Sequence, residues 1–299
     1  MNQIAIYGKN IKEKYLPAFQ QLVDGLKSRG YIVLCEENFA AFLHEKYGFV
    51  WDSMPFYNKE HGISGEVSML LSFGGDGTFL DAVEYICNSE VPILGINSGR
   101  LGFLANVKVD EISHAVDDIV TGNYQLEQRQ MLQLEVDGEK IQGMDYALNE
   151  VGVQKMAIAS LLKIHAYIGD VFLTTYWADG LVVATPTGST AYSMSGGGPI
   201  VSPECQNIIL TPISPHNLSM RPLIVPASAE IRLEVESRSG SFILSTDLHV
   251  CKVSDGCKLT VQCHPKKLNV VKLPGHNYYE TLRKKLKWGE DERNDKSQE

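Results

Sequence analysis

The chain has 299 residues, a formal net charge of −9 at pH 7, 44% hydrophobic residues and 21% charged residues. This composition is typical of a soluble globular protein, and the length is sufficient for two domains with separate cores. The negative charge argues against general affinity for nucleic acid but not against a small anionic ligand. No apolar run approaches the roughly 20 residues that span a bilayer. Since the N-terminal MNQIAIYGKN also lacks the pattern of a signal peptide, we expect no membrane association.

The cysteines are predicted to be core or incidental thiols. None of the six belongs to a C-x-x-C pair. A zinc site normally needs closer pairs and usually histidines, so the sequence assigns no metal ligands. Unpaired thiols are typical of a reducing compartment, and we therefore predict a cytoplasmic protein.

The first hundred residues alternate between strand and helix patterns. Continuous apolar runs such as VSMLLSF at 67–73 are typical of strands that are buried on both faces of a sheet. The predicted strands cover 4–8, 31–35, 67–73 and 91–97, and the predicted helices cover 15–30, 38–48 and 78–89, with a loop at 51–65. Repeated β-α units predict a doubly wound parallel sheet in an α/β domain over residues 1–97.

The pattern changes after a further predicted helix at 110–122. Three segments with period-two alternation each surround a turn pair: 132–141 around Asp137-Gly138, 163–177 around Gly169-Asp170 and 231–244 around Ser239-Gly240. Successive hairpins predict an all-β, sandwich-type domain over residues 98–271. A helical pattern at 276–288 predicts that residues 272–299 rejoin the first domain, and the polar end GEDERNDKSQE is predicted to be disordered.

LSFGGDGTFLDA is the first segment that points to a function, because Gly74, Gly75 and Gly77 surround the carboxylate of Asp76. A buried parallel strand followed by glycines and a helix places this turn at the carboxyl edge of the sheet, where ligands bind. Backbone N–H groups at such a turn favour phosphate, although the segment matches neither the P-loop nor the dinucleotide-binding pattern. A carboxylate beside a phosphate site can accept a hydroxyl proton during phosphoryl transfer. Alternatively, Asp76 simply caps its own helix.

A second stretch, DGLVVATPTGSTAYSMSGGGP at 179–199, joins a short apolar strand to a polar turn and three glycines. Its small residues and hydroxyl groups suit a ribose or an amide that lies against the backbone. Low-complexity linkers have a similar composition, but they rarely contain an apolar strand and a tyrosine. These residues alone do not decide between a ligand-binding site and a linker.

Together, these motifs resemble those of NAD kinases. GGDGTFLDA is followed by INSGRLGFL at 96–104, by Asn149-Glu150, by ADGLVVATPTGSTAYSMSGGGP and by HNLSMRPLIVP at 216–226. The order is similar to that of the family from residue 4 to about 288, and TPTGSTAY is a highly specific part of the pattern. GGDG alone is shared with diacylglycerol kinase, sphingosine kinase and phosphofructokinase relatives.

The resemblance implies an ATP-dependent NAD kinase. Such an enzyme transfers the γ-phosphoryl group of ATP to the 2′-hydroxyl of the adenosine ribose of NAD, which gives NADP and ADP. Mg²⁺ or another divalent metal is implied to accompany ATP. Relatives are commonly dimers or tetramers, so a homo-oligomer is also expected.

The resemblance further assigns roles to single residues. Asp76 matches the proposed catalytic base that activates the 2′-hydroxyl. The turn is expected to bind the phosphates of ATP through Gly74, Gly75, Gly77 and Thr78. The residues expected to contact NAD are Asp76, Gly77, Phe103, Asn149, Glu150, Asp179, Thr190, Ala191, Tyr192, Ser195 and His249. On sequence grounds alone, Asn149-Glu150 could equally end a strand, and Phe103 could equally belong to a core.

One departure concerns Asp247-Leu248-His249, where many relatives carry Asp-Gly-Gln. A neutral imidazole both donates and accepts hydrogen bonds, so His249 either replaces the glutamine or is an ordinary surface residue. Two other functions stay open. A lipid or sphingoid kinase shares the GGDG turn, although such relatives carry a P-x-G-T-G-N-D-like segment where this chain has INSGRLGFL. A non-catalytic sensor of NAD or NADP would need the second motif alone.

Overall fold

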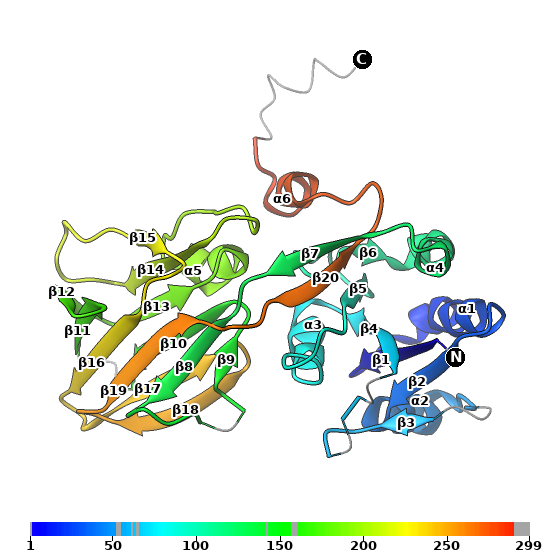
Figure 1. Cartoon of the computed structure of the whole chain (residues 1–299), viewed down its shortest axis with the longest axis horizontal. Helices are drawn as coiled ribbons and strands as arrows, with labels where there is room; N and C mark the ends of the chain where they lie inside the picture. Colours follow the sequence, from blue (N-terminus) through cyan, green and yellow to red (C-terminus); the bar gives the residue numbers. More distant parts are fainter. Residues whose placement is uncertain are drawn as a thin grey trace. The chain divides into compact units, whose positions relative to one another are not determined.

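The computed structural model of the chain describes residues 2–51, 55–60, 62–63, 66–141, 143–156 and 161–289. The chain divides into two compact units (Figure 1). The first unit contains Met1–Glu127 and Asn269–Glu299, and the second contains Gln128–Leu268. None of the helices in these described ranges is long and apolar enough to cross a membrane.

The first unit is built around a sheet with the strand order β3-β2-β1-β4-β5-β20-β7, and β6 also pairs with β5. The strands are β1 (Gln3–Gly8), β2 (Ile32–Glu36), β3 (Phe56–Tyr57), β4 (Val67–Gly74), β5 (Ile93–Asn97), β6 (Val107–Lys108), β7 (Gln125–Arg129) and β20 (Leu268–Lys272). The strands β1, β2, β4 and β5 confirm the predicted strands, and they pair in parallel. The loop predicted at 51–65 contains the short strand β3 and otherwise lies partly outside the described residues.

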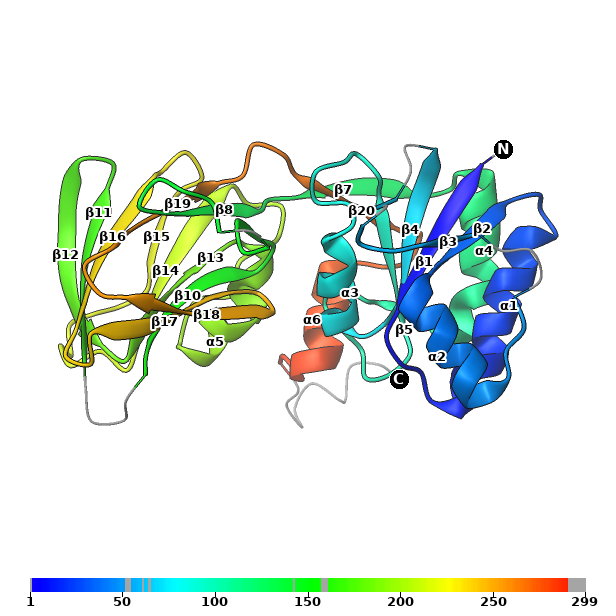
Figure 2. The ribbon, with the colours of Figure 1, turned by 90° about the horizontal axis from the view of Figure 1, so that it is seen from below.

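Helices cover both faces of this sheet. They are α1 (Leu16–Lys27), α2 (Glu37–Tyr47), α3 (Asp76–Val83), α4 (Ile112–Thr121) and α6 (Tyr278–Leu286), with short 3-10 turns η1 (Glu13–Tyr15) and η2 (Val109–Glu111). Figure 2 shows α1, α2 and α4 on one face and α3 on the other, which is the doubly wound arrangement that the sequence predicts. On the first face, the buried ring of Phe19 in α1 packs edge-on against Phe39 of α2 and Phe73 of β4. The apolar side chains of the amphipathic helices thus build the core against the sheet.

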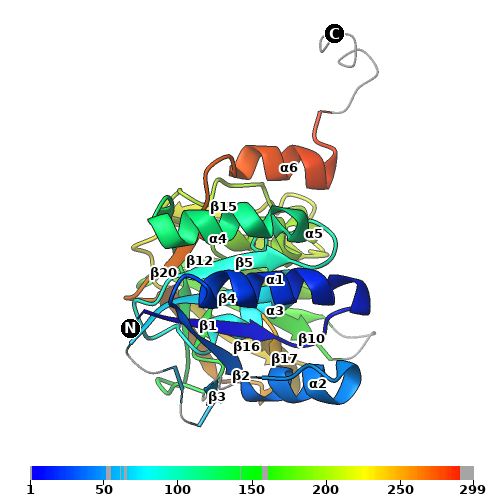
Figure 3. The same cartoon turned by 90° about the vertical axis from the view of Figure 1, so that its right-hand side faces the viewer.

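Residues 98–127 belong to the first unit, although the sequence placed the domain boundary after residue 97. The strand β6 extends the first sheet beside β5, and α4 packs against α1, as Figure 3 shows. At this contact Gly25 of α1 faces Val116 of α4, where an added Cβ would lie 3.3 Å from a valine methyl. Because β6 and α4 pack on elements that lie far away in the sequence, the domain boundary falls after these two elements and not after the last predicted parallel strand.

The second unit consists of two antiparallel sheets, in the orders β15-β14-β13-β10-β17-β18 and β12-β11-β16-β19-β8-β9. The elements are β8 (Leu132–Val136), β9 (Tyr146–Ala147), β10 (Glu150–Lys155), β11 (Leu162–Ile168), β12 (Val171–Ala178), β13 (Gly180–Ala184), η3 (Thr187–Thr190), α5 (Tyr192–Ser195), β14 (Asn207–Ile213), β15 (Leu223–Pro226), β16 (Ile231–Ser237), β17 (Ser241–Thr246), β18 (His249–Ser254) and β19 (Lys258–Cys263). Buried side chains from both sheets, such as Val151, Phe242, Ile164 and Leu233, share one core. This unit confirms the predicted β-sandwich.

The three predicted hairpins have different outcomes. Gly169-Asp170 joins β11 and β12, which pair antiparallel as predicted. The hairpin predicted at Ser239-Gly240 is wrong, because β16 and β17 on its two sides belong to different sheets. At Asp137-Gly138 the bridge between Val136 and Glu139 closes the turn, while β8 pairs with β9 and β19. A turn sequence determines the local bend, whereas the partner of each strand depends on where its apolar side is buried.

The chain ends largely as predicted. The helix α6 lies within the predicted segment 276–288 and belongs to the first unit. Most of the polar segment predicted to be disordered, residues 290–299, lies outside the described residues. The helix predicted at 78–89 is present as α3 but begins at Asp76 and ends at Val83, followed by turns.

Candidate active site

Asp76 is the first residue of α3 and follows the carboxyl end of β4 by two residues. Gly75 occupies the N-cap position with an extended backbone, and it has no side chain that could accept a capping hydrogen bond. The alternative in which Asp76 caps its own helix is therefore wrong. Its carboxylate binds a different segment of the first unit.

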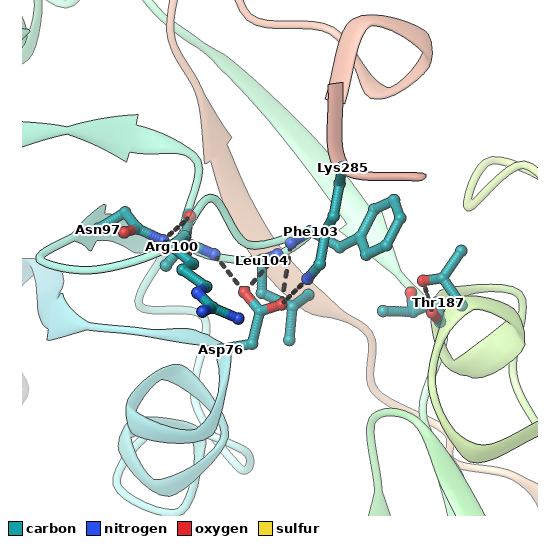
Figure 4. Close-up of polar contacts among 9 residues, drawn as sticks. Asp76, Asn97, Arg100, Phe103, Leu104, Thr187 and Lys285 are labelled. Carbon is teal, nitrogen blue, oxygen red and sulfur yellow. Dashed lines mark hydrogen bonds and ion pairs between the residues drawn. The ribbon is translucent and has the colours of Figure 1, made fainter. Parts of the chain in front are cut away.

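The carboxylate of Asp76 accepts four hydrogen bonds. Oδ1 accepts the backbone N–H groups of Leu104 at 2.9 Å and Ala105 at 3.0 Å. Oδ2 accepts the backbone N–H of Phe103 at 2.9 Å and the ammonium of Lys285 at 3.1 Å (Figure 4). The structure thus brings together two predicted site residues, Asp76 and Phe103, and adds Lys285, which sequence reasoning missed.

The loop that donates these bonds is shaped by Asn97 and Gly102. The Asn97 side-chain amide donates to the backbone oxygens of Arg100 at 2.7 Å and Ala105 at 3.0 Å. At Gly102, a Cβ would lie 2.0 Å from Oδ1 of Asp76, so this position has room for glycine alone. The NSGRLGFLA segment at 97–105 therefore turns three successive N–H groups toward one carboxylate.

A pocket of about 350 Å³ lies beside the glycine-rich turn. Its lining residues are Asn10, Ile11, Lys12, Phe42, Lys46, Gly74, Gly75, Thr78, Ser98 and Gly99. Backbone groups at the turn and the ammonium groups of Lys12 and Lys46 suit the phosphates of a nucleotide. Sequence reasoning missed both lysines, although Lys12 comes shortly after the first strand, at the carboxyl edge of the sheet where ligands bind. Gly77 lies in the first turn of α3, with open space where a Cβ would be.

In the second unit, Asn149-Glu150 and the TPTG turn form one local structure. The Thr185 hydroxyl donates to the backbone oxygen of Leu148 at 2.6 Å, and its N–H donates to that of Asn149 at 2.8 Å. Gly188 approaches so closely that a Cβ would lie 2.1 Å from the Asn149 oxygen. Two motifs that are distant in the sequence are thereby placed side by side.

Asp247 supports the same segment. Its carboxylate accepts the backbone N–H groups of Leu148 at 2.7 Å, Asn149 at 2.9 Å and Glu150 at 3.1 Å. Its φ of 44° lies in the left-handed region, which aspartate tolerates better than most residues. The pKa of Asp247 is raised above its usual value, because burial outweighs the opposing effect of these three N–H bonds. The sequence drew attention to this segment for His249, but Asp247 is the residue that holds the motif.

Glu150 is the protonated partner of this carboxyl pair. Burial, followed by the nearby Asp247 charge, raises the pKa of Glu150 to about 8, against a lowering effect of the Tyr192 backbone N–H. Its Oε2 is buried and has no hydrogen-bond partner among the described residues. Because Asp247 is already bonded by three N–H groups, we assign the proton near neutral pH to Glu150. A neutral carboxyl group can donate a hydrogen bond to a ligand oxygen.

The hydroxyl groups of the second motif divide into two sets. Ser189 bonds with the backbone of Val201, and Ser193 bonds with Thr211 at 2.8 Å; both serines are buried and stabilise the fold. The partly or fully exposed residues of the motif that the resemblance assigns to NAD are Thr190, Ala191, Tyr192 and Ser195. These residues are the ones that a ligand can reach.

His249 and Asp179 occupy different places in the second unit. His249 begins β18 opposite Thr246, is partly exposed, and lowers the pKa of Asp247 by its charge. Asp179 precedes the five-residue strand β13 and Thr185 follows it, which separates the two by roughly 16–20 Å. Asp179 forms an ion pair with Lys155 at 2.6 Å. Asp179 thus lies at the opposite end of β13 from Glu150, whereas Ile213, which pairs with Gly180, also lies beside Gly196, the neighbour of Ser195.

Known proteins match the chain along its length. The ATP-NAD kinase N-terminal domain family matches residues 4–124, and the ATP-NAD kinase C-terminal domain family matches residues 148–273. The NAD kinase of Cytophaga hutchinsonii is 40% identical over 290 residues, which cover 97% of this chain and 99% of that protein. The chain belongs to the NAD kinase family. A second NAD kinase, from Flavobacterium psychrophilum, is 39% identical and covers 98% of this chain and 100% of its own length.

Solved NAD kinase structures share both parts of the fold. Yeast NADH kinase complexed with NADH matches with a TM-score of 0.83 at 26% identity, over 97% of this chain and 89% of that chain. The NAD kinase from Archaeoglobus fulgidus in complex with ATP matches with a TM-score of 0.71 at 22% identity, over 95% and 98% of the two chains. The parallel-sheet unit and the β-sandwich unit are thus those of this family.

Proposed function

We infer that this chain is an ATP-dependent NAD kinase, which transfers the γ-phosphoryl group of ATP to the 2′-hydroxyl of the adenosine ribose of NAD. The products are NADP and ADP. The observation that carries this inference is the geometry of Asp76, which lies at the head of α3 next to the lysine-lined pocket. A carboxylate beside a phosphate site is the arrangement that activates a hydroxyl acceptor in phosphoryl transfer.

Within the first unit, the pocket beside the turn is the proposed site of the ATP phosphates. Gly74, Gly75 and Thr78 line it, with Lys12 and Lys46 as the cationic groups. Neighbouring Gly77 adds an open backbone position in the first turn of α3. Because phosphoryl transfer needs alignment and charge stabilisation more than covalent chemistry, these groups supply most of what the reaction requires.

For NAD, we propose contacts in each unit separately. In the first unit, Asp76 binds and deprotonates the acceptor hydroxyl, Gly77 offers its backbone beside it, and Phe103 offers an aromatic ring. In the second unit, the buried and unpartnered Oε2 of Glu150 supports a contact with the ribose hydroxyls. The further proposed contacts are Asn149, Thr190, Ala191, Tyr192, Ser195 and His249. Asp179 is a further proposed contact, at the end of β13 away from Glu150, where it pairs with Lys155.

The proposed metal requirement follows from ATP. No group of three or more His, Cys, Asp or Glu side chains in the described part of the chain could hold a metal ion. The pocket instead offers the hydroxyl groups of Thr78 and Ser98 and the side-chain amide of Asn10 beside two lysines, and these hydrogen-bond donors suit phosphates. Mg²⁺ is commonly bound through substrate phosphates with few protein ligands. We therefore propose that Mg²⁺ or another divalent metal enters with ATP and neutralises part of the phosphate charge.

Three further properties remain proposals from the sequence. We propose a cytoplasmic location, a homo-oligomeric state and the absence of nucleic-acid partners. The separate cysteines, none of which is paired in a disulfide, fit a reducing compartment. The acidic net charge of −9 fits small-molecule substrates better than nucleic acid.

The test is the formation of ADP and NADP by the purified chain with ATP, Mg²⁺ and NAD, against a control without NAD. Equal amounts of ADP and NADP support the proposed function. ADP formation with diacylglycerol or a sphingoid base in place of NAD would indicate a lipid kinase. NAD binding by calorimetry without ADP release would indicate a sensor.

A further inference from the structure

Helix α6 brings one of its lysines to the proposed catalytic carboxylate. Asn277 caps the helix by accepting the Glu280 N–H at 2.8 Å, and buried Leu282 anchors it in the first unit. The neighbouring lysines then have different environments. Lys284 pairs with Glu280 on its own helix, whereas Lys285 lies 3.1 Å from Oδ2 of Asp76.

Lys285 contacts two of the three first-unit residues that we assign to NAD, Asp76 and Phe103. Besides its ion pair with Asp76, its ammonium lies 4.5 Å from the centroid of the Phe103 ring. Tyr278 of the same helix lies beside that ring, with centroids 6.1 Å apart. In the free enzyme, the carboxylate and the aromatic ring are therefore both in contact with α6.

The acceptor capacity of Asp76 is full in this state. A carboxylate offers about four lone-pair positions, and Asp76 accepts three backbone N–H groups and the Lys285 ammonium. A hydroxyl group that donates its proton to Asp76 must therefore replace one of these four donors.

Lys285 is the donor that can leave. The three N–H groups belong to a loop fixed by the side-chain amide of Asn97 and by the close approach at Gly102. The Lys285 side chain is 32% exposed, has a flexible stem and regains hydration when it is released. Replacement of Lys285 thus opens Oδ2 without a change in the loop.

We propose that Lys285 competes with NAD for the proposed catalytic base: its ammonium holds Oδ2 of Asp76 in the free enzyme and gives way to the acceptor hydroxyl of NAD. The inference rests on the proposed function. It implies that NAD binding must disrupt the Lys285–Asp76 ion pair, so that part of the binding free energy is spent before the reaction begins.

The test compares Lys285→Met with Lys284→Met, which removes a neighbouring lysine that does not touch Asp76. Calorimetry should show that Lys285→Met binds NAD about two- to fivefold more tightly, which is the range for loss of one partly exposed ion pair. The turnover number should stay within about twofold, because the ion pair is already broken in the reacting complex. Lys284→Met should leave affinity and turnover unchanged, and Lys285→Arg should restore wild-type affinity.

A second background separates this role from a structural one. With Asp76→Asn, the carboxylate that Lys285 holds is gone, so adding Lys285→Met should lose most of its effect on NAD affinity and keep only the part that comes from uncovering the Phe103 ring. The proposal is overturned if Lys285→Met leaves NAD affinity unchanged or weakens it, if turnover falls tenfold or more, or if the gain in affinity persists in full in the Asp76→Asn background.

A measurement without NAD keeps the inference separate from the proposed function. Lys285→Met, but not Lys284→Met, should accelerate amide hydrogen exchange in residues 278–286 of the ligand-free protein. Unchanged exchange would contradict the ion pair and overturn the proposal. Failure of the wild-type chain to form NADP would reject the proposed function, whatever the exchange experiment shows.

Discussion

Replacement of Glu150 by glutamine should make the protein more stable at alkaline pH. The Glu150 carboxyl lies next to Asp247, and its Oε2 is buried without a hydrogen-bond partner in the described structure. Burial and the Asp247 charge raise its pKa to about 8, from 4.5 for an unperturbed group. Above pH 8 the folded protein must therefore hold a second, poorly solvated negative charge at this place. Glutamine has nearly the same shape and never acquires that charge.

The sign and size of the effect follow from proton linkage. Between pH 4.5 and about 8, the folded state holds a proton on Glu150 that the unfolded state has lost, so stability falls as the pH rises. Below pH 4.5 the stabilisation that comes from the protonated Glu150 is fully present, and above about pH 8 it is lost. A shift of one pKa unit corresponds to about 1.4 kcal/mol, so the raised pKa of Glu150 can lower the free energy of unfolding by at most roughly 4–5 kcal/mol. Because Glu150 is partly exposed, solvent screening reduces this loss of stability, and we expect a difference in the free energy of unfolding of about 2–3 kcal/mol at alkaline pH.

The assay is urea unfolding of the ligand-free wild type and Glu150→Gln from pH 4.5 to 9, followed by circular dichroism. Other titrating groups are common to both proteins, so the difference in the free energy of unfolding isolates Glu150. It should be near zero at pH 4.5 and should favour the glutamine variant increasingly up to pH 9. Glu139→Gln, at an exposed position of the same unit, is the matched control and should show no such trend. A difference that does not vary with pH, or a glutamine variant that is less stable at pH 9, would refute the reasoning.

Three more substitutions test the two carboxylate anchors. Asp76→Asn should lower the rate of NADP formation by about 10²–10⁴, the usual value of general-base assistance, while calorimetry still detects NAD binding; near-normal turnover would remove the base assignment. Gly102→Ala should lower the melting temperature and the turnover together, because its Cβ would lie 2.0 Å from Asp76, whereas Gly99→Ala has space and should melt like the wild type. Asp247→Asn keeps the left-handed backbone accessible but turns a donor toward backbone N–H groups, so urea unfolding should show a loss of about 1–3 kcal/mol; an unchanged stability would contradict its anchoring role.

The sequence is sufficient to predict the layers of the fold because each buried element carries its own pattern. The apolar run at 67–73 predicts a central strand, and it becomes β4 in the middle of the sheet. Pairing in the second unit is less predictable from local sequence. Gly169-Asp170 and Ser239-Gly240 have similar turn signals, yet the first closes a hairpin and the second crosses from one sheet to the other. The difference lies in which distant strands cover the apolar sides of the chain.

The residues of the candidate site likewise differ in how far their local sequence predicts them. Asp76, Asn149 and the TPTG turn stand in glycine-rich or unusual local sequences that can be recognised without a structure. Lys285 is 209 residues from Asp76 and is one of several lysines in a basic helix, so nothing in its local sequence distinguishes it. Asp247 lies 97–99 residues from the backbone groups that it holds. Long-range contacts of this kind depend on packing and leave no short motif.

Asp76 and Asp247 have the same hydrogen-bonding geometry but different proposed roles. Each accepts three successive backbone N–H groups and so fixes a segment that carries proposed ligand contacts. What differs is the remaining neighbour. Beside Asp247 stands Glu150, a second carboxyl whose pKa is raised to about 8 by burial and by the Asp247 charge, and Asp247 itself is bonded to the backbone N–H groups. Beside Asp76 stands the ammonium of Lys285, a partly exposed group that can withdraw into water. A carboxylate whose fourth partner can leave is able to accept a proton from a substrate, and for this reason we propose Asp76, and not Asp247, as the base.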